Sequence, residues 1–385
     1  MTQTAAVFTT EAESAVAGQD LGRQIRDALG QPDAVIVFAS SRYDHASLLR
    51  ALHETCQPRV MVGASSAGEF TDAHHGESSA CAMAIQSTDM RFASGIGHGV
   101  STDRVAAARE VVTTFEGMSV HDLPYRGALV LTDALAGHAD DLLEQLTIAT
   151  SGLYELAGGG AGDDQLTRTV VFRGVEVASD AVVALEIRSH KPLGVGVQHG
   201  WTPASEPLRI TEVDGARIVS IDGFPAVEAF EQHAELTGQR LERDAPLPFF
   251  LHNILGIDTP GGYRLRVPLS IDRDGAVVCA AEIPSGARVH IMKTSSASAT
   301  EAASEAARSA VRGLRGGRPA AALFFDCVAT RLRMGDVFGF ELEAVRSAIG
   351  DRPLVGCNTY GQLARAEGQF AGFHNCTAVV LAFPD

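Results

Sequence analysis

One arrangement of strands and loops occurs three times in this chain of 385 residues. Each copy reads as a short apolar strand, a helical segment, a second apolar stretch that ends in a Gly-rich polar loop, and another strand. The three loops cover residues 63–69, 158–164 and 356–362. The first and the third read V-G-x-x-x-x-G-E/Q, and the second is one residue shorter. Because ligands often bind where Gly-rich loops follow buried strands, the repetition predicts a binding scaffold.

The predicted elements alternate between strands and helices, with hairpins inserted. The stretches 35–39 and 128–131 are continuously apolar, which is typical of strands buried on both faces. Residues 80–86 and 91–97 read as two strands joined by Ser87-Thr88-Asp89, which is a hairpin signal. This order favours an α/β fold of the mixed α+β kind, in which repeated strand-helix-strand-hairpin units form mixed sheets flanked by helices.

A change of composition near Asp222-Gly223-Phe224-Pro225 indicates a domain boundary, because an acidic helical stretch over 226–243 follows the turn. We therefore predict two domains preceded by a helix. The N-terminal helix lies within residues 1–33, the N-terminal domain covers 34–220, and the C-terminal domain covers 221–385.

Charge and composition narrow the classes of partner and the cellular location. The net charge is -16 and the pI is about 5.2, so binding to nucleic acid or to an anionic membrane is not expected. The sequence shows no signal-peptide pattern and no run of eighteen apolar residues, which predicts a cytoplasmic protein without membrane insertion. Six scattered cysteines without a C-x-x-C pair fit reduced cytosolic thiols.

The second loop offers acidic groups beside glycines. Gly159 and Gly160 let the backbone approach a ligand closely, and the carboxylates of Asp163 and Asp164 are suited to a ligand ammonium group. The alternative is a tight turn that the Asp side chains cap. A phosphate-binding P-loop is excluded because the G-x-x-x-x-G-K-[ST] pattern is absent.

Short polar groups in the other two loops suit a zwitterion. Loop amides and hydroxyls would bind its carboxylate, while Glu69 or Asp163 would bind its ammonium group. Arg331, which follows the first strand of the third copy, could clamp a carboxylate, or it could form a salt bridge with Asp326 or Asp336. For the loops, the alternative is turn chemistry, in which such side chains bond their own backbone. The candidates here are Ser65, Ser66, Glu69, Asn358, Thr359, Tyr360 and Gln362.

Catalytic patterns are weak in this sequence. The stretch from Gly63 to Gly68 lacks the G-x-S-x-G of a nucleophile elbow. Gly95-Ile96-Gly97-His98-Gly99 lacks the last glycine of a dinucleotide fingerprint. We therefore expect a protein that is not an enzyme, with an enzyme of unrecognised type as the less favoured reading.

Several stretches in a specific order resemble the FIST family, a bacterial sensory domain with N-terminal and C-terminal parts. The similarity covers roughly Ala34 to Phe383. The stretches are Gly63 to Glu69, Gly158 to Asp164, Gly200 to Pro203, Ile221 to Ala226, Leu323 to Arg331, Thr359 to Gln362 and His374 to Thr377.

The resemblance implies a signal-transduction sensor that binds a small ligand, an amino acid being one suggestion, and that acts on a separate partner protein. Asn375, in the last matching stretch, joins the candidate ligand-binding residues. Gln362 departs from the family, whose third loop commonly ends in Glu, and this weakens any role that needs a negative charge there. The sequence shows no pattern of a kinase core, a cyclase segment or a chemoreceptor coiled coil, so we expect the signal to pass to a separate partner.

The resemblance also implies an alternative function, because some members of the family look like haem proteins that sense nitric oxide and regulate a histidine kinase. Haem b is therefore an alternative cofactor. Haem needs one axial histidine in an apolar pocket, and His199, His252 and His374 have apolar or aromatic neighbours. The alternative for each is a hydrogen-bonded structural histidine. Trp201, the only tryptophan, is a candidate wall of a ligand site or a core residue. No metal-binding spacing of histidines is present.

Overall fold

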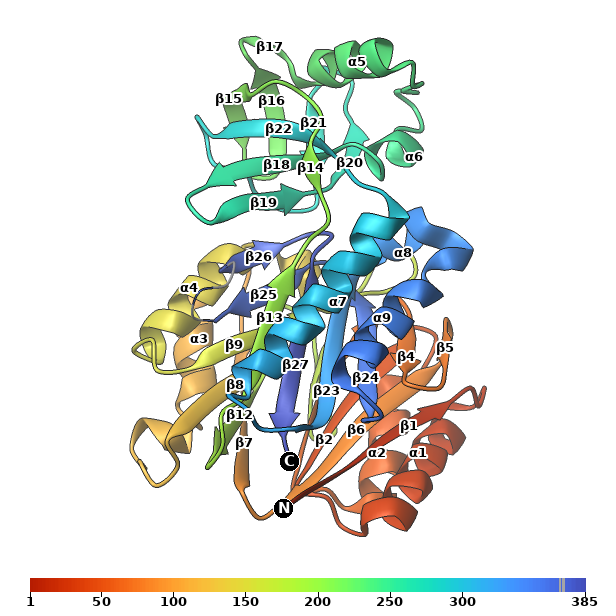
Figure 1. The fold of residues 1–385 in the computed structure, drawn as a ribbon, viewed down its shortest axis with the longest axis vertical. Coiled ribbons are helices and arrows are strands. Elements are labelled where there is room, and N and C mark those ends of the chain that lie inside the picture. The colour runs from red at the N-terminus through yellow and green to blue at the C-terminus, as the bar shows by residue number, and fades with distance from the viewer. Residues whose placement is uncertain (367, 369–370) are drawn as a thin grey trace.

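The structure is a computed structural model that describes residues 1–366, 368 and 371–385. It consists of three repeats that share one order of elements, and of a smaller unit inserted in the third repeat (Figure 1). In Figure 1 the inserted unit, with α5 and α6, lies above the three repeats, and both chain ends lie at the opposite end of the molecule.

The first repeat begins with an edge strand and continues through two helices to a parallel strand, a hairpin and a returning strand. Its elements are β1 (Thr2–Thr9), α1 (Ser14–Leu29), β2 (Ala34–Ser40), α2 (His45–Cys56), β3 (Val60–Ser66), β4 (Glu69–Thr71), β5 (His75–Gly76) and β6 (Ala80–Ser87).

The second repeat has the same order, with two short 3₁₀ helices added. Its elements are β7 (Met90–His98), α3 (Arg104–Val112), η1 (Glu116–Met118), β8 (Tyr125–Thr132), η2 (Ala134–Ala136), α4 (Ala139–Ala149), β9 (Glu155–Gly160), β10 (Val171–Arg173), β11 (Glu176–Ala178) and β12 (Ala181–Ser189).

The third repeat is interrupted after its edge strand. Its elements are β13 (Gly194–Gln198), α7 (Ser296–Gly313), β23 (Pro319–Cys327), α8 (Val328–Met334), η3 (Gly335–Val337), α9 (Gly339–Ile349), β24 (Leu354–Thr359), β25 (Gln362–Arg365), β26 (Gly372–His374) and β27 (Ala378–Pro384).

The inserted unit forms a nine-stranded sheet of its own. Its elements are β14 (Thr202–Pro203), β15 (Leu208–Asp214), β16 (Arg217–Ile221), β17 (Phe224–Pro225), α5 (Ala226–Thr237), α6 (Leu247–Phe250), β18 (Ile254–Thr259), β19 (Gly262–Arg266), β20 (Pro268–Ile271), β21 (Val277–Cys279) and β22 (Arg288–Lys293).

Each repeat donates its hairpin to the sheet of another repeat. The hairpin β4–β5 of the first repeat extends the sheet of the third, β10–β11 of the second extends the first, and β25–β26 of the third extends the second. The three six-stranded sheets have the orders β1-β6-β2-β3-β10-β11, β7-β12-β8-β9-β25-β26 and β13-β27-β23-β24-β4-β5. The exchange closes a ring of three sheets, so each repeat completes another.

The central strands β2, β8 and β23 place alternate residues in two different cores. Phe38, Leu131 and Phe325 lie in one shared central cluster, whereas the neighbouring residues in sequence face the outer helices. The outer clusters lie beneath α1 and α2, α3 and α4, and α7 and α9. Burial on both faces explains why these strands are continuously apolar in the sequence.

A glycine at the start of each loop has the same structural role in all three repeats. A Cβ on Gly63, Gly158 or Gly356 would collide with the carbonyl oxygen of the residue beside it on the parallel strand, which is Val37, Val130 or Phe324 respectively. The glycine lets the two backbones approach closely and therefore recurs at the start of each loop.

The mixed α/β fold class predicted from the sequence is confirmed. Sequence analysis assigns only a helix to residues 1–33, whereas the structure also has β1, the edge strand that pairs with β6. The predicted division of the chain at about residue 220 stays a prediction. The six cysteines are all buried and unpaired by disulfides.

Candidate functional site

Backbone hydrogen bonds join the three Gly-rich loops in a closed ring. Ala67 N donates to Asn358 O at 3.0 Å, Tyr360 N donates to Gly160 O at 3.1 Å, and Gly162 N donates to Ser65 O at 2.9 Å. Each bond runs from one repeat to another, and the three together return to the starting loop. Loops 63–69, 158–164 and 356–362 therefore lie side by side.

A second set of bonds follows the same cycle. Asn358 N donates to Gly68 O, Gly160 N donates to Gly361 O, and Ser65 N donates to Val170 O, at 2.8, 2.8 and 2.9 Å. Gly159 and Gly160 are buried among these loops. Open cavities lie on the outer side of this ring.

Glu69 and Gln362 occupy equivalent positions and make equivalent contacts. The Glu69 carboxylate accepts hydrogen bonds from Ser66 Oγ at 2.5 Å and from Ser79 N at 3.2 Å. The Gln362 amide donates to Thr359 Oγ1 at 2.7 Å and accepts from Thr377 N at 3.2 Å. Each side chain therefore ties a loop to the start of the returning strand.

Four other predicted residues have structural hydrogen bonds. Ser65 Oγ accepts from Val170 N at 3.1 Å, and Tyr360 Oη donates to Asp163. The Asp163 carboxylate also accepts from the backbone N–H of Thr167 and Arg168, at 2.9 and 2.8 Å. These contacts lower the pKa of Asp163 to about 2 although burial opposes them. Asn375 Oδ1 accepts from Val267 N at 3.2 Å and so ties the inserted unit to the third repeat.

Glu69, Arg331 and Asn358 come together at a cavity of about 600 Å³ between the first and third repeats, which we call the first cavity. The hairpin β4–β5 forms one wall, and the segment from α8 to the start of α9 forms the other. Its lining residues are Glu69, Phe70, His75, Gly76, Glu77, Arg331, Leu332, Gly335, Asp336, Phe338, Gly339 and Asn358.

Two buried donors at the first cavity have no acceptor within the described residues. They are Arg331 Nε and Asn358 Nδ2. Both side chains lie near Gly68, where a Cβ would be 3.6 Å from Arg331 Nε and 2.8 Å from the amide oxygen of Asn358. Because buried N–H groups without partners are costly, a site with two of them is suited to an acceptor group of a ligand.

The charges at the first cavity are mixed. Burial raises the pKa of Glu69 to about 7, although the hydrogen bonds from Ser66 and Ser79 act in the opposite direction. Burial lowers the pKa of the Arg331 guanidinium, and the nearby Glu69 carboxylate partly offsets this. Arg331 Nη1 forms an ion pair with Glu77, neither Asp326 nor Asp336 being its partner. Asp336 adds a third carboxyl group to the lining.

Asp164 lies at another cavity, of about 430 Å³, between the first and second repeats, which we call the second cavity. Its side chain accepts from Ser40 Oγ and Ser41 Oγ at 3.4 and 3.3 Å. The three loops thus lead to two separate cavities instead of one shared cleft.

Trp201 is buried where the inserted unit meets the third repeat. The Arg333 guanidinium lies 5.6 Å from the centre of its ring. The adjacent cavity, which His199 also lines, has a volume of about 10 Å³. Trp201 is therefore a packing residue of this contact, and it lines neither the first nor the second cavity.

The three candidate histidines do not fit haem. His199 Nε2 lies 3.2 Å from Tyr263 O, and its Nδ1 accepts from Trp201 N at 3.3 Å, so both ring nitrogens are engaged. The cavity beside His199 holds at most a water molecule, not a porphyrin. His252 is exposed just after α6, while His374 is fully buried and burial holds its pKa well below the usual range.

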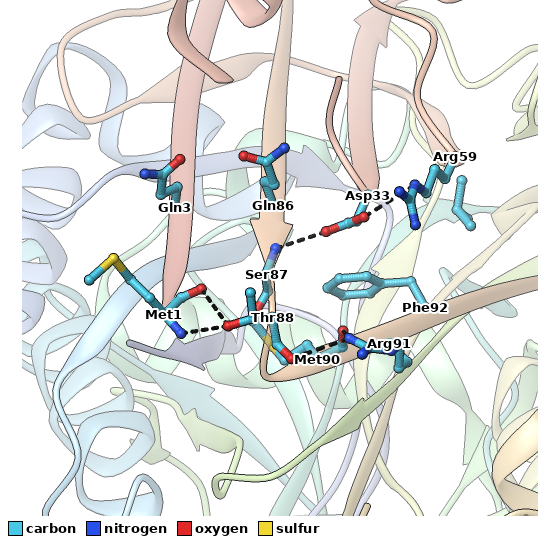
Figure 2. A pocket seen from close by; sticks show the side chains of 11 residues that line it. Met1, Gln3, Asp33, Arg59, Gln86, Ser87, Thr88, Met90, Arg91 and Phe92 are labelled. Atoms are coloured by element: carbon cyan, nitrogen blue, oxygen red, sulfur yellow. Dashed lines mark hydrogen bonds and ion pairs between the residues drawn. The ribbon is translucent and has the colours of Figure 1, made fainter. Parts of the chain in front are cut away.

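Figure 2 shows another cavity, of about 640 Å³, near the N-terminal end of the chain. Arg59 and Asp33 form an ion pair on one side, and the Phe92 ring lies between Arg59 and Arg91 (Figure 2). None of the residues predicted from the sequence lines it. We therefore assign the candidate site to the first cavity, where three of them meet.

Sequence reasoning did not identify Glu77, Asp336 or His75, which complete the first cavity. His75 lies in a two-residue strand, Glu77 lies just after it and Asp336 lies in a short 3₁₀ helix, and elements this short carry no periodic pattern. Among the described residues, no cluster of three His, Cys, Asp or Glu side chains is placed to hold a metal ion. No helix in the described parts of the chain combines the length and apolar character needed to cross a membrane.

Comparison with known families and proteins identifies relatives of this chain. The FIST N domain matches residues 33–223, and the FIST C domain matches residues 226–365. An uncharacterized protein of Mycobacterium tuberculosis is 25% identical over 362 residues, 91% of each chain. An uncharacterized protein of Mycobacterium bovis is 24% identical over 264 residues, 67% of each.

Solved structures give only distant matches. Cyanuric acid hydrolase from A. caulinodans is 7% identical, with a TM-score of 0.34 and 99% of each chain covered. PurLQS from Thermotoga maritima is 12% identical, with a TM-score of 0.24, and the match covers 100% of this chain and 73% of that one. Similarities at this level carry no functional argument.

Proposed function

The chain belongs to the FIST family, whose domains are signal-transduction sensors, and we propose that it binds a free amino acid in the first cavity. Glu69 lies within the FIST N match, while Arg331 and Asn358 lie within the FIST C match. A ligand in this cavity would therefore contact both domains at once.

The observation that carries this proposal is the pair of unsatisfied donors, Arg331 Nε and Asn358 Nδ2. A ligand carboxylate accepts from both, and its charge compensates the guanidinium in a partly buried place. Charge-assisted hydrogen bonds of this type are among the stronger ones in proteins. A side chain at Gly68 would strike the amide oxygen of Asn358, so the glycine leaves room beside that amide.

The opposite charge of the ligand has its own partners. Glu69 lies on the wall formed by the hairpin β4–β5, and Asp336 lies with Arg331 on the opposite wall. An ammonium group near the first of these walls favours the charged form of Glu69. A carboxylate and an ammonium group held side by side are the shared feature of α-amino acids, which is why this class fits better than a simple anion.

Binding can become a signal because the two walls belong to different repeats. The hairpin β4–β5 comes from the first repeat and α8 from the third, and a ligand between them favours whichever arrangement brings the walls together. We propose that a separate protein, for example a histidine kinase, reads this change in the cytoplasm. We further propose that the ligand is released unchanged, so that the protein is not an enzyme.

Isothermal titration with the twenty common L-amino acids tests the proposal. We expect at least one to bind the wild type, and we expect Arg331→Gln to weaken that binding at least tenfold. Arg346→Gln is the matched control, since Arg346 is an exposed partner of Glu343 on α9. If none of the twenty binds, or if both variants behave alike, the assignment is wrong. Chemical analysis of the ligand after long incubation checks that it is unchanged.

A further inference from the structure

The ring of three repeats has three equivalent outer positions. At each one, the segment that follows β2, β8 or β23 faces the hairpin, or the loop before the hairpin, that another repeat donates. The segment after β23 faces β4–β5, the segment after β2 faces loop 161–170, and the segment after β8 faces β25–β26. The first cavity occupies the first of these positions and the second cavity the second.

The third position is closed by the inserted unit. Glu282 accepts a hydrogen bond from His138 N at 2.9 Å, at the start of α4. Arg266 donates to Phe373 O at 2.8 Å and also forms an ion pair with Asp140. The Arg266 side chain is 1% exposed, so the inserted unit buries this guanidinium against the second and third repeats. Of the three equivalent positions, two therefore remain open to a ligand.

The second cavity offers both charges of a zwitterion. Asp164 is exposed, and its carboxylate is contacted only by two serine hydroxyls at 3.3–3.4 Å, without a cationic partner among the described residues. The Arg168 guanidinium is exposed and makes no hydrogen bond or ion pair within the described parts of the chain. The Asp163 carboxylate, which accepts from four consecutive backbone N–H groups, fixes the loop that carries both residues.

Other groups around the second cavity are already engaged. Arg42 Nη2 donates to Glu11 O at 3.0 Å, and its guanidinium lies 4.7 Å from the Tyr43 ring. The His45 ring packs on Phe172 at 4.9 Å, and its Nε2 lies 3.1 Å from Ser40 O. Tyr43 and His45 therefore form a fixed wall, and Asp164 and Arg168 are the groups left to meet a ligand.

We propose that the second cavity is a second binding site for an α-amino acid, with Arg168 binding the carboxylate and Asp164 the ammonium group. The inference rests on the proposed function, because the equivalence with the first cavity supplies the ligand class. A volume of about 430 Å³ lies within the range of roughly 300–1,000 Å³ common for small-molecule sites. The protein then binds two ligands per chain.

Site-specific fluorescence separates the two sites. Trp201 is the only native tryptophan and is buried away from both cavities, so a new tryptophan reports on its own surroundings. His75→Trp places the reporter at the first cavity, and Gln165→Trp places it at the second; both residues are exposed. Each variant is titrated with the twenty common L-amino acids.

We expect a saturable emission change in both variants. Adding Arg168→Gln to Gln165→Trp should abolish that change, whereas Arg109→Gln, on the exposed face of α3, should preserve it. If only His75→Trp responds, or if the Gln165→Trp response survives Arg168→Gln, the second site is wrong and the proposed function stands. If only Gln165→Trp responds, the second site stands and the assignment of the first cavity falls. If neither responds, both proposals fall.

Discussion

Glu77 and Arg331, which are 254 residues apart in the sequence, form an ion pair at the first cavity. Glu77 comes from the turn after β5 in the first repeat, and Arg331 comes from α8 in the third. The Glu77 side chain is 64% exposed, whereas that of Arg331 is 19% exposed. An intramolecular carboxylate thus pairs with the guanidinium that we assign to the ligand carboxylate.

Glu77→Gln should therefore strengthen amino-acid binding, because it removes a competitor for Arg331. An exposed ion pair contributes about 0–1 kcal/mol, so the gain should be up to about fivefold in Kd. Isothermal titration measures it. Glu343→Gln is the control, since Glu343 is also 64% exposed and pairs with Arg346 on α9, and neither residue lines the first cavity. Weaker binding in Glu77→Gln would mean that Glu77 contacts the ligand directly.

The stability of the protein should depend on pH through Glu69. Its pKa is about 7 in the folded protein and 4.5 without the fold, so the folded state binds more protons between these values. Stability then falls as pH rises from about 4.5 to about 7. Glu69→Gln should remove this loss, because an amide at this position can copy the contacts of Gln362 with Thr359 and Thr377.

Urea unfolding of wild type and Glu69→Gln at pH 5 and pH 8 measures this effect. The variant should gain up to roughly 3 kcal/mol relative to wild type between the two pH values, since one pKa unit corresponds to about 1.4 kcal/mol. Glu235→Gln, at an exposed position on α5, should show no such change. An equal difference between variant and wild type at both pH values would show that Glu69 does not titrate in this range.

Gly356→Ala should destabilise the protein severely. The new methyl group would collide with the carbonyl oxygen of Phe324 and with the Phe70 ring, both within the packed sheet. We expect a loss of at least about 3 kcal/mol, as for other substitutions that overfill a core. Gly339→Ala is the matched control in the same repeat, because a Cβ there meets no atom within 4 Å. Thermal unfolding compares the two, and equal melting temperatures would contradict the close approach of β23 and β24.

Haem should not bind at the candidate histidines. Loading the purified protein with haem and removing the excess should leave no Soret band, because the cavity beside His199 holds about 10 Å³ and both of that ring's nitrogens are engaged. A stable Soret band that His199→Ala or His374→Ala removes would require these side chains to rearrange, and it would revive the gas-sensor alternative.

The three repeats could be predicted because each contains the same local sequence signals, a glycine at the start of the loop and a continuously apolar strand. Glycine is needed at positions 63, 158 and 356 because a side chain would collide with the backbone of the adjacent parallel strand. The same pair of strands occurs in each repeat, so the same glycine does too. Burial on both faces gives the strands of Phe38 and Phe325 their apolar sequence. These features led to the fold class and to the three converging loops.

Other features depend on distant partners and leave no local mark. The hairpins β4–β5 and β10–β11 are two or three residues per strand, too short for a sequence pattern to say which sheet they join. The second loop has an insertion before β10, so Val171, paired with Ala64, takes the place that Glu69 and Gln362 have in the other repeats. Glu77 could not be predicted as a site residue, because its partner Arg331 is 254 residues away in the sequence and only the fold brings the two together.

Hydrogen–deuterium exchange with and without the amino acid found by titration tests the central claim most directly. If the ligand bridges the first and third repeats, exchange should slow in residues 69–77 and also in residues 328–339, the two walls of the first cavity. A ligand that binds tightly while exchange in both segments stays unchanged would contradict the account.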